Sequence, residues 1–407
     1  MSKNILVICQ HYWPENFRVT DLCEGFVERG YQVDVLCGTP NYPQGKFYPG
    51  YSYWGKRREV HNGVKIFRTC EIPRGTNTKL RVFLNYISFP IASFFSLPRF
   101  LFKKYDKVLI YQLSPVFMGI VGIVVGEIKK IEVTTYVLDL WPDNLYSVLP
   151  VKNKFLKDLL YKISTWFYRK SDKLIAVSPE MESLLRMRTG KERRKLTTIY
   201  QYCEKIHERK LVDGTLRDRF KGYFNVVYTG NITPAQSFET IINAALLLKK
   251  RGYEKKIHLV IVGGGMSVGD FRGAIQENQL ESMFHFEGLK PVEEMPKYYD
   301  IADALLVTLA KSDLLKLTIP AKVTSYIASG KPIIASLEGS GQVLIEQIGC
   351  GLVSPPEDSH ELCENIIKLF KMEETHRKKM GKKGVDYHFK FLERNKSVDK
   401  ITQFFFR

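Results

Sequence analysis

The sequence predicts an α/β protein built from two doubly wound parallel-sheet domains. The chain has 407 residues, which is too long for one typical hydrophobic core. Residues 4–9 form a continuous apolar run, as expected for a strand covered on both faces, and a loop, a helix and a second strand at 32–37 follow. The same order begins again at 225–228, after a polar and charged stretch over 203–222.

The first half contains further elements of the same kind. Its first helix has apolar residues at helical spacing and ends at Gly30. Strands are expected at 107–111, 133–138 and 173–177. The apolar run 116–125 is too short to span a bilayer, so we expect a buried helix there.

The second half repeats the pattern, with a helix predicted over 237–250. Its remaining strands are expected at 257–262, 283–286, 304–309 and 332–335. The predicted domains are therefore 1–205 and 206–385, followed by a basic C-terminal helix, 386–407, that could pack back on the first domain. Two such domains predict a ligand cleft between them.

Composition limits the function classes. Hydrophobic residues make up 44% and charged residues 26%, which excludes a disordered chain or an integral membrane bundle. The net charge of +18 predicts an anionic partner, although a generally basic proteome would give the same count. The seven cysteines contain no C-x-x-C pair, so neither a zinc ribbon nor a redox motif is expected. We expect a cytosolic protein without disulfides or signal peptide.

One segment, Val82–Leu97, has no charged residue and is flanked by Lys79, Arg81, Arg99, Lys103 and Lys104. Pro90 and Pro98 interrupt it, and it is barely long enough to span a bilayer. Two interpretations remain open: a helix lying in the membrane interface with cations at the lipid headgroups, or a buried helix pair.

The stretch 318–332 predicts a short helix followed by a buried strand. Thr318 and Pro320 suit a helix start, and Gly330 suits a left-handed helix end. Lys322 lies in the first turn, where the N–H groups and helix dipole favour an anion. An ordinary helix of an α/β sheet would show the same spacing.

Dinucleotide binding is disfavoured, because no G-x-G-x-x-G follows the first strand of either half. The corresponding turns are 10–15 and 229–236. The three glycines at 263–265 follow a later strand and are predicted to form a tight turn.

Several motifs occur in a recognisable order along the chain. They are Tyr12-Trp13-Pro14-Glu15, Gly30-Tyr31-Gln32-Val33, Asn41-Tyr42-Pro43, Leu138-Asp139-Leu140-Trp141-Pro142-Asp143, Tyr228-Thr229-Gly230-Asn231 with Ala235-Gln236, Val260-Ile261-Val262-Gly263, and the segment from Pro320 to Pro332. Nearly end to end, the chain resembles GT-B fold glycosyltransferases of family 4. It is most similar to bacterial enzymes of capsular and O-antigen polysaccharide synthesis, including the fucosamine-transferase-like group.

The resemblance implies a lipopolysaccharide- or capsule-building hexosyltransferase that retains anomeric configuration and needs neither metal nor cofactor. Its implied partners are a UDP-sugar donor, a lipid-linked acceptor of the undecaprenyl diphosphate type and the anionic inner face of the cell membrane. Nucleic acid is not an expected partner, since the basic residues are spread out with no recognised module.

The resemblance also assigns candidate donor residues. Lys322 and the Gly230-Asn231 turn would hold the diphosphate, although Lys322 could also be a solvated surface lysine. Gln236 would contact the donor or merely start its helix, and Gly288 would lie near the uracil. Ser325 would face the ribose.

On the acceptor side, Glu15, Asn16 and Arg18 would face the donor phosphates and the acceptor. Asp139 is the candidate catalytic residue, which would orient or deprotonate the acceptor hydroxyl. The alternatives are a surface arginine at 18 and a carboxylate that caps loop N–H groups at 139.

The chain departs from the family at two positions. Many members have two glutamates, eight residues apart, where this chain has Leu317 and Ser325. Neither residue can act as a charged acceptor for sugar hydroxyls. A non-catalytic GT-B protein that partners another transferase, or a sugar-nucleotide epimerase, is therefore an alternative.

Overall fold

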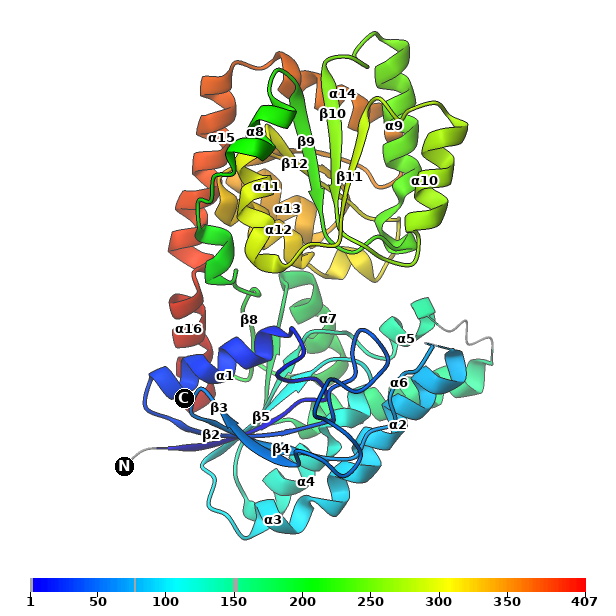
Figure 1. The fold of residues 1–407 in the computed structure, drawn as a ribbon. Helices are drawn as coiled ribbons and strands as arrows, with labels where there is room; N and C mark the ends of the chain where they lie inside the picture. Colours follow the sequence, from blue (N-terminus) through cyan, green and yellow to red (C-terminus); the bar gives the residue numbers. More distant parts are fainter. Residues whose placement is uncertain (1–2, 77, 149–152) are drawn as a thin grey trace. The chain divides into compact units, whose positions relative to one another are not determined.

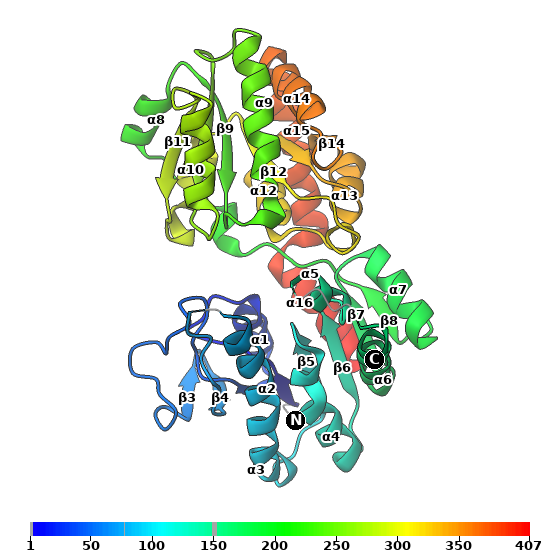
Figure 2. The same ribbon diagram turned by 90° about the vertical axis from the view of Figure 1, so that its right-hand side faces the viewer.

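The computed structural model describes residues 3–76, 78–148 and 153–407. The chain divides into two compact units, the first formed by residues 1–199 with 398–407 and the second by residues 200–397. Each unit contains one largely parallel sheet with helices packed on both faces (Figures 1 and 2). The predicted fold class, two doubly wound parallel-sheet domains, is confirmed.

The first unit has an eight-stranded sheet in the order β3-β4-β2-β1-β5-β6-β7-β8, in which the β3–β4 pair alone is antiparallel. Its strands are β1 Asn4–Ile8, β2 Gln32–Cys37, β3 Arg58–His61, β4 Val64–Arg68, β5 Lys107–Gln112, β6 Val133–Val137, β7 Lys173–Ala176 and β8 Leu196–Thr198. Its helices are α1 Arg18–Glu28, α2 Lys79–Phe95, α3 Leu97–Leu101, η1 Val116–Gly119, α4 Ile120–Lys129, α5 Asp143–Val148, α6 Lys154–Lys170 and α7 Pro179–Thr189.

The second unit has a six-stranded, wholly parallel sheet in the order β11-β10-β9-β12-β13-β14. Its strands are β9 Phe224–Thr229, β10 Ile257–Val262, β11 Phe284–Gly288, β12 Ala304–Thr308, β13 Ile333–Ser336 and β14 Gly351–Ser354. Its helices are η2 Lys205–Glu208, α8 Gly214–Phe220, η3 Pro234–Gln236, α9 Phe238–Lys250, α10 Val268–Glu277, η4 Val292–Glu294, α11 Met295–Ile301, η5 Leu315–Leu317, α12 Ala321–Ser329, α13 Ser340–Ile348, α14 Ser359–Lys371, α15 Glu374–Tyr387 and η6 His388–Leu392.

Each sheet has one point where the strand order reverses direction. In the first sheet this point lies between β1 and β5, and in the second between β9 and β12. In doubly wound sheets, ligands bind beyond the carboxyl ends of the strands at this point. The loops after β1, β5, β9 and β12 are therefore where each unit should carry a binding site.

The structure adds strands that the sequence analysis did not predict. The β3–β4 hairpin turns at Asn62 and Gly63, whose φ angles of 46° and 81° suit a tight two-residue hairpin turn. An Asn-Gly pair between two short strands is the sequence signal for this hairpin. The edge strands β8 and β14 have three and four residues, too few for a visible apolar pattern.

The domain boundary lies at 199/200, whereas 205/206 was predicted. The reason is local pairing in the second unit, where the backbone N–H of Cys203 donates to the Leu392 carbonyl. At the other end, helix α16 runs over Arg394–Phe406, and residues 398–407 belong to the first unit. There Phe406 stacks on Tyr31 at 5.0 Å, and Asp399 pairs with Arg29 at 2.7 Å.

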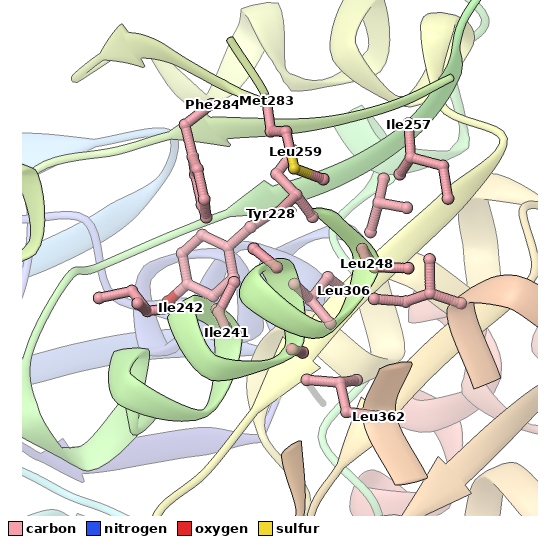
Figure 3. Packing of buried hydrophobic residues seen from close by; sticks show 14 of the residues in the cluster. Tyr228, Ile241, Ile242, Leu248, Ile257, Leu259, Met283, Phe284, Leu306 and Leu362 are labelled. Carbon is pink, nitrogen blue, oxygen red and sulfur yellow. The ribbon is translucent and has the colours of Figure 1, made fainter. Parts of the chain in front are cut away.

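One core cluster of the second unit lies between its sheet and helices α9, α10 and α14. Figure 3 shows Tyr228 of β9 with its ring among Ile241, Ile242, Leu259 and Phe284. The ring of Tyr228 is fully buried, while its hydroxyl bonds to the loop after β9. This tyrosine therefore ties the core to the loop where the predicted donor site begins.

Candidate functional site

The predicted site residues lie in two groups, one in each unit, and each group is described within its own unit. The second unit holds the predicted donor residues Gly230, Asn231, Gln236, Gly288, Lys322 and Ser325. The first unit holds the predicted acceptor-side residues Glu15, Asn16, Arg18 and Asp139.

Glycines allow the loops after β9, β10 and β11 to approach one another closely. The N–H of Gly230 donates to the Val262 carbonyl at 2.9 Å, and that of Gly263 donates to the Gly288 carbonyl at 2.9 Å. Gly263 has a φ of 151°, and a Cβ there would lie 1.8 Å from the Gly230 carbonyl oxygen. A side chain at 263 would therefore separate the loops, which accounts for a glycine at this position.

Lys322 contacts the turn after β9, where the sequence analysis placed the diphosphate. Its Nζ donates to the Tyr228 hydroxyl at 2.6 Å and lies 3.8 Å from the centre of the Tyr228 ring. The Tyr228 hydroxyl in turn donates to the Asn231 carbonyl at 2.7 Å. A Cβ at Gly230 would lie 3.2 Å from the Lys322 Nζ. Lys322, Gly230 and Asn231 are thus brought together by one tyrosine.

The environment of Lys322 changes its acidity. Burial lowers the pKa of the Lys322 ammonium from 10.5 to about 7. The residue lies in the first turn of α12, whose N-cap is Pro320 and has no side-chain capping bond. The helix start therefore offers backbone N–H groups that can bind an anion. An anion bound there would also favour the protonated form of the Lys322 amine.

Ser325 forms a hydrogen bond within its own helix. Its side chain is buried, with 5% of the residue exposed, and its hydroxyl donates to the Ala321 carbonyl of the same helix at 3.3 Å. Position 325 lies within the buried face of α12, next to the buried residues Thr324 and Tyr326. The expectation that Ser325 faces the ribose stays a prediction, and in this structure its hydroxyl is hydrogen-bonded within α12.

Gln236 helps to start its helix, which is the second of the two roles expected for it. Its Oε1 accepts hydrogen bonds from the backbone N–H and the hydroxyl of Thr233, at 3.2 and 2.5 Å, which completes a capping box. Gly288 ends β11 with a φ of 71°, and its carbonyl accepts from Gly263. Both residues build the loop edge, and the structure shows no further role for either.

In the first unit, Asp139 follows β6 and bonds to the loop after β5. Its Oδ2 accepts from both the backbone N–H and the hydroxyl of Ser114, each at 3.1 Å. Asn144 donates to that same hydroxyl at 2.9 Å. Burial raises the pKa of the Asp139 carboxyl above its usual range. Asp139 thus lies next to the switch point of its sheet with a fixed orientation and increased basicity, and the sequence analysis missed its two partners.

Glu15 is a buried residue of the first unit. Only 3% of it is exposed, and its Oε1 accepts from the backbone N–H groups of Asn41 and Tyr42, both at 2.7 Å. Its Oε2 lies 2.9 Å from the His11 Nδ1. The carboxylate therefore fixes the loop after β2, and the expected contact of Glu15 with phosphate or acceptor stays a prediction.

The other two predicted residues of this loop lie nearer the surface. Asn16 is exposed, and Arg18 is half-buried as the first residue of α1. Their assignment to the phosphate or acceptor side stays a prediction.

A buried polar network at the carboxyl ends of β1, β2 and β4 was not predicted. Glu71 is 1% exposed, and its Oε1 accepts from the side chains of Gln10, Asn41 and Asn85. Burial raises the pKa of the Glu71 carboxyl to about 7. Because the network joins three loops and α2, no local pattern in the sequence could reveal it.

Comparison with known proteins identifies the two units. The family described as "Glycosyltransferase Family 4" matches residues 16–201, and that described as "Glycosyl transferases group 1" matches residues 217–386. Glycosyltransferase WbjE of Pseudomonas aeruginosa is 25% identical over 58% of this chain and 59% of its own length. WcaI of Escherichia coli, named for colanic acid biosynthesis, is 23% identical over 89% of this chain and 91% of its own. The chain thus spans less than two thirds of WbjE.

Solved structures give the same fold. Sucrose-phosphate synthase of Thermosynechococcus elongatus superposes with a TM-score of 0.73 at 17% identity, covering 98% of both chains. HepE of Anabaena, solved with UDP and glucose, gives 0.70 at 13% identity over 99% of both chains. The lipopolysaccharide glycosyltransferase WaaG gives 0.68 at 13% identity, over 98% of this chain and 99% of its own. The two units therefore match the family 4 and group 1 glycosyltransferase domains, and together they have the GT-B fold.

Proposed function

We propose that the protein transfers a sugar, with retention of configuration and without a metal, from a UDP-sugar to a lipid-linked oligosaccharide at the inner face of the cell membrane. The observation that carries the proposal is the contact of Lys322 with Tyr228 at the Gly230-Asn231 turn. The relative WcaI, named for colanic acid biosynthesis, supports the proposed role in capsule or O-antigen synthesis. The fucosamine-transferase-like subgroup remains part of the proposal.

The proposed chemistry breaks the bond between the sugar anomeric carbon and the diphosphate oxygen. The acceptor hydroxyl forms the new bond to that carbon, and UDP leaves with the bonding electrons. Protonated Lys322 and the N–H groups at the start of α12 would neutralise the charge that develops on the diphosphate. Asp139 would receive the hydroxyl proton, a task that its raised pKa favours.

A donor screen tests this function. Purified protein is incubated with a panel of UDP-sugars and bacterial membrane lipid extract, and released UDP is measured. At least one donor should give lipid-dependent release. If the folded protein releases UDP from no donor in the panel, the proposed activity is wrong.

Membrane attachment is proposed from two helices of the first unit. The segment Leu80–Leu101 is long and apolar enough to cross a membrane by length and composition alone, and only 22% of its apolar 18-residue window is buried. In α2, Phe83, Ile91 and Phe95 are 53%, 55% and 84% exposed, which disfavours the buried-pair interpretation. We therefore favour a helix lying in the interface, with its apolar side chains in the bilayer.

Helix α6 supports the same proposal and was missed by the sequence analysis. Phe155, Leu159 and Trp166 are exposed on it, and so are its basic residues. The basic residues are Lys154, Lys157, Lys162, Arg169 and Lys170. A basic helix with exposed aromatic residues is typical of binding to anionic lipid headgroups.

One observation favours a second candidate, a non-catalytic GT-B protein. Leu317 has no carboxylate, and the Ser325 hydroxyl bonds within its own helix. Calorimetry with UDP separates the two candidates. A non-catalytic GT-B protein should bind no UDP, whereas the proposed enzyme should bind it.

A further inference from the structure

A groove of about 660 Å³ lies beside α2 in the first unit. One wall is a stripe on α2 formed by Leu84, Ile87, Ile91 and Phe95, spaced three or four residues apart on one helix face. The opposite side comes from the loop before β3, with Tyr53, Trp54 and Arg57. We call this the α2 groove. Figure 2 shows α2 continuing into α3 along the side of the first unit.

The apolar lining of the α2 groove is open to solvent. Trp54 is 86% exposed, and on the α2 wall Phe95 is 84% and Ile91 is 55% exposed. Burying such side chains against hydrocarbon would remove a large unfavourable contact with water. The groove therefore suits an apolar ligand.

One cation lines the groove. Arg57 donates to the Tyr53 carbonyl and to the Cys70 sulfur, the latter at 2.6 Å, and lies over the Trp54 ring at 5.6 Å. None of these partners is acidic, so the guanidinium charge is not neutralised by them. That charge suits an anion attached to the apolar ligand.

The acidic residue of the lining does not oppose an anion. Glu71 is only 1% exposed, and its Oε1 is held by Gln10 and Asn85 inside the protein. The Ser88 hydroxyl accepts from the Ile72 N–H at 3.0 Å, so that this side of the groove is bonded to α2. The groove thus combines apolar walls, a guanidinium in contact with non-acidic groups, and a carboxylate that is buried and hydrogen-bonded.

We propose that the α2 groove binds the hydrocarbon chain of the lipid-linked acceptor, with Arg57 contacting the phosphate at the head of that chain. This inference rests on the proposed function, because it names how the transferase would hold its acceptor. It assigns recognition to the lipid part of the acceptor, separately from the sugar that is extended.

Equilibrium dialysis with radiolabelled geranylgeranyl diphosphate tests the groove without requiring activity. Leu84→Gln places an amide on the groove wall, and Phe83→Gln makes the same change at the neighbouring residue, which does not line the groove. We expect Leu84→Gln to raise the Kd at least tenfold and Phe83→Gln to change it less than twofold. Arg57→Gln should weaken the binding of geranylgeranyl diphosphate but not the binding of geranylgeraniol. Circular dichroism checks that all variants are folded.

Three results would overturn the groove assignment: no binding by the wild type, equal effects of the two glutamine variants, or equal affinity for lysophosphatidylglycerol. The last would assign the groove to an ordinary bilayer lipid. The donor screen separates this failure from that of the proposed function. If the wild type transfers sugar to lipid and Leu84→Gln does so equally well, the groove assignment fails while the transferase stands.

Discussion

Lys322 is the residue on which the donor site depends most. Its amine is partly buried against Tyr228, and a pKa of about 7 leaves it only partly charged in the free protein at neutral pH. A diphosphate would supply the missing counter-charge and raise that pKa. Binding should therefore be linked to proton uptake by this one side chain.

We predict that UDP affinity falls as the pH rises above about 7, by up to tenfold per pH unit, because free Lys322 then loses its proton. Lys322→Met should bind UDP weakly with little pH dependence, and should lower kcat/KM by roughly 10²–10³-fold. Calorimetry from pH 6 to 9 measures the affinity. Lys311→Met, at an exposed residue near η5, is the control and should behave like the wild type.

The lowered pKa of Lys322 also affects the stability of the ligand-free protein, which should rise with pH where UDP affinity falls. The folded pKa of Lys322 is lower than the unfolded value of 10.5, so the unfolded chain binds more protons between about pH 7 and 10.5. The free energy of unfolding should therefore increase as the pH rises through this window, so that the folded protein becomes more stable. Urea unfolding of the wild type and Lys322→Met measures it, and an identical pH slope in both proteins would contradict the shift.

His258 gives a second pH dependence, away from the proposed site. Burial and then His285 lower the pKa of His258 to about 4, and Tyr223 stacks on its ring at 3.6 Å. As the pH falls from 6.5 towards 4, the unfolded chain takes up a proton that the folded one resists, so the protein loses about 1–3 kcal/mol. His258→Phe should reduce this loss in urea unfolding at pH 5 and 7.5, whereas His376→Phe, at an exposed position, should not.

Among the elements, the loops after β9 and β10 depend on glycine. Gly263→Ala would place a Cβ 1.8 Å from the Gly230 carbonyl oxygen at a φ of 151°, so we predict a loss of about 2 kcal/mol or more together with weaker UDP binding. Gly273→Ala in α10 meets no atom within 4 Å and should stabilise the protein by about 0.5–1 kcal/mol. Thermal unfolding and calorimetry measure both variants. A neutral effect of Gly263→Ala would show that these loops separate easily.

The apolar helix α2 and the basic helix α6 carry the prediction on membranes. Reversing Arg81, Arg99 and Lys104 to glutamate should reduce sedimentation with phosphatidylglycerol vesicles by at least tenfold, because the headgroups lose their cationic partners. Lys103 is left unchanged, because it pairs with the buried Asp34. Reversing Lys379, Lys382 and Lys383, three exposed residues of α15, is the matched control. Equal losses in both sets would mean that net charge, rather than this surface, causes the binding.

At the scale of the whole molecule, the sequence predicted the features of the fold that depend on local signals. Helix α12 begins after Pro320 and ends at Gly330, with a φ of 78°, as predicted, because both signals act within one turn of chain. The two parallel sheets followed from continuous apolar strands and the restart of the pattern in the second half. The strand order and the switch points required the structure, because they depend on pairing between distant segments.

The site was predicted less completely for the same physical reason. Lys322, Gly230 and Asn231 were placed by motif, and the structure joins them through Tyr228. The Oε1 of Glu15 accepts from the backbone at Asn41 and Tyr42, and no spacing in the sequence indicates these two partners.

Transfer itself is the most direct test of the proposed function. A UDP-sugar labelled in the sugar is incubated with lipid extract, and both free UDP and label in the lipid fraction are counted for the wild type and for Lys322→Met. We predict equal amounts of UDP and lipid-bound sugar from the wild type, and a loss of roughly 10²-fold or more in the variant. UDP release without any label in the lipid, or a variant as active as the wild type, would contradict the proposed transferase.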